Sequence, residues 1–226
     1  MDFLLAYATS LAAFMPYILP GIKVILRNRN YDIEHLVEHE NMRSSTVLKE
    51  HICIHTFSGI AFDLLNPQPE MILLEDIIHS LSLINRFNGA AKFPYSVAQH
   101  SLYVASLLPP ELKLHGLLHD APEAYVGDMV SPLKKIMSQY KEVEANISRV
   151  VANVFGLSYP APAEVKKADL AVLSAEREQV LNPSYGPWYK DFPLPADIHI
   201  EGMSWSQVRD LYSSELKSLL GKRPKQ

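Results

Sequence analysis

Apolar residues recur at helical spacing over most of the chain after residue 70. Apolar positions three and four apart place one face of a segment toward a core, which is typical of amphipathic helices. Glycine and proline residues interrupt the pattern and mark where the segments end. The pattern predicts helices at 75–86, 95–108, 111–126, 139–155, 161–181 and 205–220, with a short helical piece at 131–137.

The stretch before these helices has a different pattern. Residues 52–63, ICIHTFSGIAFD, contain two short β-prone pieces on either side of Ser58 and Gly59, which is typical of a small hairpin. The fold class that follows is all-α, a helical bundle with one small β-hairpin. We expect one domain over residues 51–226, preceded by an apolar segment and a polar linker over residues 1–50.

The N-terminal segment raises the question of a membrane anchor. Residues 3–22 carry no charge and are about long enough to cross a bilayer, but Pro16 and Pro20 disfavour one uninterrupted helix. Basic residues follow directly, so a spanning segment would leave the rest of the chain in the cytoplasm. An apolar packing arm, or an extension upstream of a functional start at Met42, fits the same residues. We expect a cytoplasmic domain and leave membrane contact through residues 3–22 open.

Composition narrows the class of protein. The 226 residues are 48% hydrophobic and 20% charged, which is ordinary for a folded domain. A net charge of −4 gives no basic surface for binding nucleic acid in bulk. Cys53 is the only cysteine, which excludes an internal disulfide and a cysteine-based zinc site and fits a reducing compartment.

The stretch LLHDAPEAYVGD, residues 117–128, places charged groups in apolar company. His119, Asp120, Glu123 and Asp128 lie among leucine, alanine and proline residues. Charged groups stay buried only when they are paired or coordinate a metal ion. On a continuous helix, His119 and Asp120 would lie about 100° apart, close enough to bind one ion.

Two further polar residues fall on apolar helical faces. His100 lies at the edge of the stripe formed by Val97 and Val104, and Asp169 lies on the face of Val172. For Asp169 alone, a buried arginine or lysine partner fits as well as a metal. Together with the histidine–aspartate pair, these residues suit Mn, Co, Fe, Ni, Mg or Zn, with positions left for water and substrate.

Several sequence blocks resemble those of HD-domain metal-dependent phosphohydrolases. The blocks are INRF, YSVAQHS, LLHDAPEAYVGDMVSPLK and VKKADLAVLSAERE, in this order over about residues 55–180. The resemblance is strongest to the branch of bacterial and phage 5′-deoxyribonucleotidases and phage dATP triphosphohydrolases. It implies an HD-type helical bundle that binds a divalent metal ion and hydrolyses nucleotides, and it gives a weak expectation of self-association.

The resemblance also implies roles for individual residues. The residues that match the metal ligands of the family are His100, His119, Asp120 and Asp169. Glu123 and Asp128 match acids that hold the attacking water or handle protons near the leaving group. Arg86 matches a residue that contacts substrate phosphate, and Ser131 and Lys134 resemble a second phosphate-contacting element.

The expected reaction is attack of a metal-activated water on the phosphorus of a 5′-deoxyribonucleotide. On a continuous helix Glu123 would share the face of His119 and Asp120, where it could accept or return a proton. A monophosphate would release phosphate, and a triphosphate such as dATP would release tripolyphosphate. The choice depends on whether basic groups such as Lys92, Lys134 or Lys135 reach beyond the cleaved phosphate.

Two rival hypotheses remain. A regulatory protein could keep the HD scaffold without catalysis, although the presence of all four ligands and Glu123 argues against this. The segment HLVEH, from His35 to His39, matches an inverted metalloprotease pattern, for which a solvated helix is the simpler interpretation.

Overall fold

A computed structural model describes residues 52–183 and 193–222. The chain separates into two units, residues 1–51 and 52–226, and all the described residues belong to the second unit. The candidate anchor at 3–22 and the HLVEH segment therefore lie outside the described residues. In the part of the chain that is described, no helix is both long enough and apolar enough to cross a bilayer.

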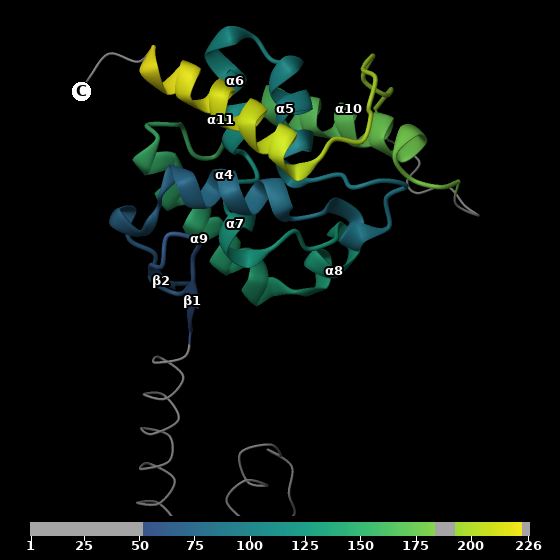
Figure 1. Cartoon of the computed structure of the whole chain (residues 1–226). Helices are drawn as coiled ribbons and strands as arrows, with labels where there is room; N and C mark the ends of the chain where they lie inside the picture. The colour runs from purple at the N-terminus through teal and green to yellow at the C-terminus, as the bar shows by residue number, and fades with distance from the viewer. Residues whose placement is uncertain (1–51, 184–192, 223–226) are drawn as a thin grey trace, which may run out of the picture. The chain divides into compact units, whose positions relative to one another are not determined.

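The described residues form an all-α fold with one small antiparallel sheet, as the sequence predicted (Figure 1). Strands β1 (Cys53–His55) and β2 (Ala61–Asp63) pair with Ile54 opposite Phe62. Gly59 in the connecting turn has a φ of +87°, a conformation that glycine adopts without steric cost. The predicted hairpin is confirmed.

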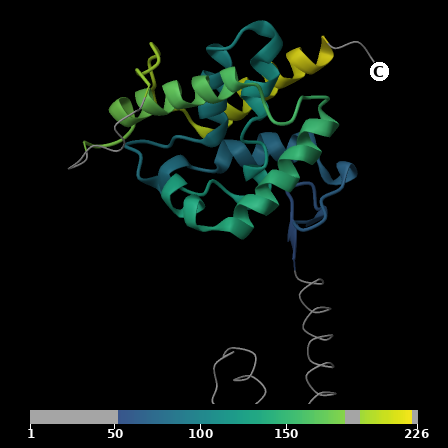
Figure 2. The same cartoon turned by 180° about the vertical axis from the view of Figure 1, so that it is seen from behind.

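The helices follow in chain order. They are α4 (Leu74–Leu83), α5 (Val97–Ser106), α6 (Lys113–Leu118), α7 (Glu123–Val126), α8 (Ser131–Ile136), α9 (Ser138–Val154), α10 (Ala163–Gln179) and α11 (Trp205–Gly221). Short 3₁₀ turns lie at η1 (Pro69–Met71), η2 (Arg86–Gly89) and η3 (Pro110–Leu112). The long helices α9 and α10 are seen best from behind (Figure 2).

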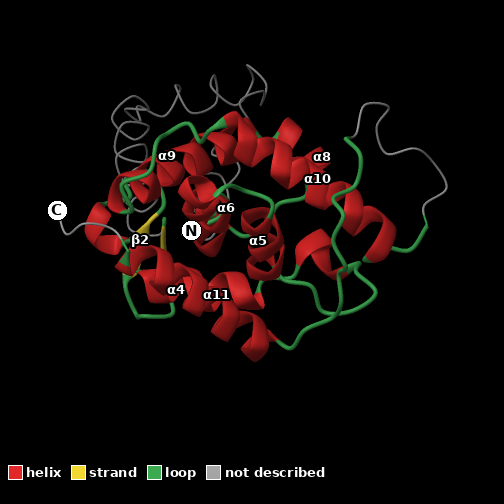
Figure 3. Ribbon diagram, turned by 90° about the horizontal axis from the view of Figure 1, so that it is seen from above, coloured by secondary structure: helices red, strands yellow, loops and turns green. Residues whose placement is uncertain are grey.

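Helix α5 lies at the centre of the bundle and contacts α4, α6, α10 and α11 (Figure 3). Its first turn is capped by Ser96, whose side chain accepts a hydrogen bond from the backbone of Gln99. Helix α6 approaches α5 closely at Gly116, where a Cβ atom would lie only 2.9 Å from the Cα of Ala105. A glycine is therefore required at this crossing.

The main core is formed by apolar side chains that α4, α5, α6 and α11 turn toward one another. Its fully buried members include Ile77, Leu81, Val97, Leu117, Tyr212 and Leu216. A second cluster between α5 and α10 contains Val104, Val165 and Val172. Together the two clusters fix α5, α6 and α10 relative to one another, and these helices carry the polar residues singled out above.

The prediction of one helix over 111–126 is wrong. Helix α6 ends at Leu118, and α7 begins at Glu123 after a break at residues 119–122. Pro122 has no N–H group, so it cannot continue the helical hydrogen-bond ladder. Tighter turns replace it, in which the backbone of Ala121 donates to Leu118 and that of Glu123 donates to Asp120.

Candidate metal centre

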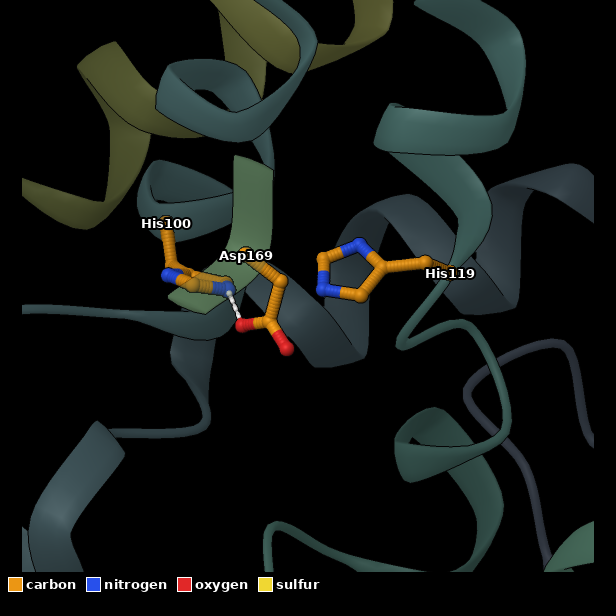
Figure 4. Close-up of side chains that lie close together, drawn as sticks. All are labelled: His100, His119 and Asp169. Atoms are coloured by element: carbon orange, nitrogen blue, oxygen red, sulfur yellow. Dashed lines mark ion pairs between the residues drawn. The ribbon is translucent and has the colours of Figure 1, made fainter. Parts of the chain in front are cut away.

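Three segments distant in the sequence bring polar side chains to one point. His100 lies on α5, His119 follows the last residue of α6, and Asp169 lies on α10. One potential ligand atom of each residue lies within 4.8 Å of those of the other two. Figure 4 shows the two imidazole rings and the carboxylate turned toward one another. This group can hold a metal ion.

The ring of His100 is held in place by a hydrogen bond on the side away from Asp169. It is fully buried, and its Nδ1–H donates to Oε1 of Glu176 at 2.6 Å. This bond leaves Nε2 to face the carboxylate of Asp169, whose Oδ1 lies 3.2 Å away. Burial lowers the pKa of His100, but neighbouring carboxylates outweigh this effect and raise it to about 9. His100 therefore carries a proton at neutral pH until a cation displaces it.

His119 is oriented in the same manner by the backbone. Its Nδ1–H donates to the carbonyl oxygen of Gly116 at 2.8 Å, which leaves Nε2 to face the site. Within the described residues, the buried Nε2 atoms of His100 and His119 have no hydrogen-bond partner. A histidine that binds a metal commonly donates its other ring N–H in this way. These two nitrogens face carboxylate oxygens without hydrogen-bonding to them, which fits metal ligation.

Asp120 lies beside this group. Its Oδ2 is 3.1 Å from Nε2 of His119 and 3.7 Å from Nε2 of His100. Two atoms that each lie about 2.1 Å from one ion are at most about 4.2 Å apart, and both distances meet this limit. The chain turns at the break after α6, and this turn brings Asp120 close to both histidines. Asp120 and Glu123 are therefore not on one continuous helix, although the sequence predicted that they would be.

The two aspartates are held in the ionised form. Burial raises the pKa of Asp120, but the imidazole of His119 outweighs burial and brings the pKa below its usual range. Burial likewise raises the pKa of Asp169, and interaction with the nearby imidazole of His100 more than reverses this effect. Two anionic carboxylates beside two imidazole nitrogens form a donor set that suits a divalent cation.

The pKa of Glu123 is shifted in the opposite direction to that of the two aspartates. It begins α7, is only 4% exposed, and its Oε2 has no hydrogen-bond partner among the described residues. Burial raises its pKa well above the usual range, and the nearby carboxylates of Asp120 and Asp128 raise it further. Glu123 therefore binds a proton far more readily than an exposed glutamate does, as a general acid or base must.

Arg86 lies against the ligand group. Its side chain is nearly buried and donates to Oε2 of Glu176 at 3.0 Å, while Nη1 is 3.7 Å from Oδ2 of Asp120. Pairing of its backbone N–H with the carbonyl of Tyr95 fixes the loop that carries it. Its Nε has no hydrogen-bond partner in the described part of the chain. The expected phosphate contact stays a prediction.

The remaining predicted residues lie on α8 and just before it. Burial raises the pKa of Asp128, which also interacts electrostatically with Arg86 and Lys134. Lys134 Nζ lies 2.6 Å from Oε1 of Glu144. Ser131, the first residue of α8, is exposed. The structure thus brings Asp128 and Lys134 near the ligand group and gives no support to Ser131.

Glu176 is the residue that the sequence analysis missed. Its carboxylate is fully buried and accepts hydrogen bonds from His100, Arg86 and the hydroxyl of Tyr95, the last at 2.8 Å. The nearby guanidinium and imidazolium outweigh burial and hold its pKa at about 2. One signal was available, because Glu176 lies two helical turns after Asp169 and therefore on the same face.

Comparison with known proteins identifies two bacterial relatives, both described only as uncharacterized. YfdR of Escherichia coli (strain K12) is 40% identical over 174 residues, which cover 73% of this chain and 97% of YfdR. A protein of Rhodobacter capsulatus is 35% identical over 161 residues, which cover 65% of this chain and 82% of that protein. No family model matches the chain.

Proposed function

The chain belongs to the family that includes YfdR, and we propose that it is a divalent-metal-dependent phosphohydrolase that cleaves the 5′-phosphoester of deoxyribonucleotides. One observation carries the proposal. Two buried histidine nitrogens, each oriented by a hydrogen bond behind it, face two ionised carboxylates beside a buried acid of raised pKa. The resemblance of the sequence blocks to HD-domain phosphohydrolases supports the same reaction and the choice of nucleotides.

The proposed metal ligands are His100, His119, Asp120 and Asp169. The grouping of His100, His119 and Asp169, and the short distances from Asp120 to both histidine Nε2 atoms, fit a divalent ion such as Mn, Co, Fe, Ni, Mg or Zn. A divalent ion there would lower the pKa of a water molecule and polarise a phosphoryl oxygen. The protein itself would supply orientation, because both histidine rings are fixed by hydrogen bonds before any ion binds.

Glu123 and Arg86 supply the remaining chemistry in this proposal. Glu123 would take a proton from the attacking water and return it to the 5′ oxygen, because burial and the nearby carboxylates raise its pKa and make it a better proton acceptor than an exposed glutamate. Arg86 would bind a phosphoryl oxygen through its unpartnered Nε–H and balance the charge there. Asp128 lies close enough to interact with both Arg86 and Lys134 and would help to hold them.

The bond changes are simple. The water oxygen bonds to the α-phosphorus, the bond from phosphorus to the 5′ oxygen breaks, and that oxygen takes up a proton. A monophosphate then gives a deoxynucleoside and phosphate, and a triphosphate gives a deoxynucleoside and tripolyphosphate.

A release assay tests the proposal. Metal-stripped protein is given Mn, Co or Mg and a panel of deoxynucleoside mono- and triphosphates, and phosphate and tripolyphosphate are measured. Asp120→Ala and Glu123→Ala should each lower turnover by roughly 10² or more. Asp210→Ala is the control, because that side chain is 70% exposed on α11. Metal binding without turnover of any nucleotide would contradict the proposal and favour a non-catalytic scaffold.

A further inference from the structure

A cavity of about 340 Å³ opens beside the candidate metal centre. His119, Asp120 and Asp169 form part of its lining. The rest of the lining comes from Pro122, from α8, α9 and α10, and from the connection before α10. A ligand in this cavity would therefore be in contact with the metal centre and would also extend away from it.

Three lysines from three different helices line the cavity: Lys134 on α8, Lys141 on α9 and Lys166 on α10. Lys134 forms an ion pair with Glu144, which also lines the cavity. Lys141 donates to the backbone carbonyl of Lys135 at 3.0 Å, and it has no ion pair among the described residues. Its charge is therefore available to an anionic ligand.

Lys166 lies at the border between the cavity and the metal centre. Its Nζ is 2.6 Å from Oδ2 of Asp169, while its side chain is 70% exposed. Exposed ion pairs are weak, and Asp169 would share its charge with a bound ion. Lys166 can then turn to a second anion in the cavity. Two lysines, Lys141 and Lys166, thus supply positive charge beyond the point where phosphate would be cleaved.

We infer that this cavity binds the phosphates beyond the one that is cleaved, so that the substrate is a nucleotide with a polyphosphate chain. The inference rests on the proposed function and chooses between its two substrate classes. The α-phosphate would lie at the metal centre, and the β- and γ-phosphates would extend along Lys141 and Lys166. A monophosphate has no group that reaches these lysines, whereas lysine is a common partner of phosphate chains.

The lysines named from the sequence sharpen the inference. Of Lys92, Lys134 and Lys135, only Lys134 lines the cavity. Lys92 instead donates to the backbone carbonyl of Gln179 at 3.2 Å. The lysines that line the cavity therefore overlap with the three named from the sequence only at Lys134, and Lys141 and Lys166 were not among those three.

A binding experiment tests the inference independently of turnover. Inorganic tripolyphosphate and orthophosphate are titrated by calorimetry into the Mn²⁺-loaded full chain. The variants are Lys141→Gln, which contacts none of the proposed ligands, and the double variant Lys141→Gln/Lys166→Gln. Lys167→Gln is the matched control, because Lys167 is an exposed neighbour on the same helix outside the cavity lining.

We expect the wild-type protein to bind tripolyphosphate more tightly than orthophosphate. In the double variant the affinity for tripolyphosphate should fall about tenfold. Orthophosphate binding and the control variant should stay unchanged, and Lys141→Gln should keep the wild-type Mn²⁺ affinity because Lys141 contacts none of the proposed ligands. The KM for a deoxynucleoside triphosphate should rise by a similar factor in the double variant. Equal tripolyphosphate binding by wild type and double variant would overturn the inference.

The kinetic outcomes separate the inference from the proposed function. Turnover of monophosphates but not of triphosphates would overturn the polyphosphate inference and leave the phosphohydrolase intact. Lysine-dependent tripolyphosphate binding without turnover of any nucleotide would support the cavity inference and contradict the proposed function.

Discussion

Behind His100, the side chains of Glu176, Tyr95 and Arg86 form a hydrogen-bonded network that is almost wholly buried. On the cavity side of Asp169, Lys141 and Lys166 are exposed and Lys134 is partly buried. We call the first set, with His100, the rear network. The second set, Lys134, Lys141 and Lys166, are the front lysines. Both sets pair cations with carboxylates at similar distances, such as 3.0 Å for Arg86–Glu176 and 2.6 Å for Lys134–Glu144.

The difference in burial gives the two sets different tasks. A buried ion pair is screened little, and removal of one partner leaves an uncompensated charge in a poorly solvated place. An exposed pair is screened by water and salt and contributes little to stability. The rear network therefore fixes the orientation of His100, one of the proposed metal ligands, before any ion binds. The front lysines can exchange their partners for an incoming anion.

The strongest test of the rear network is Glu176→Gln. Loss of the carboxylate leaves the guanidinium of Arg86 without its nearest charge partner, and we expect a loss of about 3–5 kcal/mol in unfolding free energy. Because His100 loses its oriented partner, metal affinity should fall about 10–100-fold. Urea unfolding and competition titration with a metal chelator measure the two effects.

Two variants serve as controls for this change. Glu178→Gln alters an exposed glutamate on the same helix and should change neither quantity. Tyr95→Phe removes one hydrogen bond to Glu176 and keeps the ion pair, so it should cost only about 1 kcal/mol. Wild-type stability and metal affinity in Glu176→Gln would show that the rear network has no positioning role.

Metal affinity should also depend strongly on pH. The pKa of His100 is raised to about 9, so a metal ion must displace a proton from its imidazole at neutral pH. Apparent affinity should therefore rise about tenfold per pH unit below that pKa, or about a hundredfold from pH 6 to pH 8. Chelator competition at several pH values measures the slope, and a flat profile would mean that His100 does not ligate the ion.

Gly116→Ala tests the backbone that orients His119. A Cβ atom there would lie 2.7 Å from Cδ1 of Leu108 and 2.9 Å from Cα of Ala105, so α5 and α6 must move apart. We expect a loss of about 1–3 kcal/mol, with weaker metal binding, because the carbonyl of Gly116 shifts with the helix. Gly221→Ala, where a Cβ meets nothing within 4 Å, should keep wild-type metal affinity.

Glu144→Gln is expected to have the smallest effect on stability. Its ion pair with Lys134 is partly exposed, so unfolding free energy should change by less than about 1 kcal/mol. The same change removes a negative charge from the cavity, and tripolyphosphate should bind more tightly. A destabilisation as large as that of Glu176→Gln would show that the ion pairs of the front lysines contribute as much to stability as the rear network does.

Most of the fold could be predicted from the sequence because it depends on local patterns. The apolar stripes of α5, α9, α10 and α11 recur at helical spacing, and the turn at Gly59 has the residue that its conformation requires. The break between α6 and α7 was missed because apolar residues lie on both sides of it, although Pro122 could have marked it. The spacing of apolar residues in the sequence thus predicts where helices lie better than it predicts where a helix is broken.

The site was predictable only in part, for a physical reason. His100, His119, Asp120 and Asp169 could be proposed because polar residues on apolar faces require partners. The partner of Arg86 is Glu176, 90 residues later in the chain, and no local pattern reveals such a pairing. A single acid near the end of a helix rich in charged residues also resembles a solvated glutamate.

A metal titration of activity tests the central claim, that His100, His119, Asp120 and Asp169 form a catalytic metal centre. Metal-stripped full-length protein is titrated with Mn²⁺ while phosphate and tripolyphosphate release from deoxynucleotides is followed. Turnover should rise in proportion to added metal and reach a plateau at about one ion per chain, and Asp169→Asn should show no such rise. Full turnover in the metal-stripped protein, or wild-type turnover in Asp169→Asn, would contradict the claim.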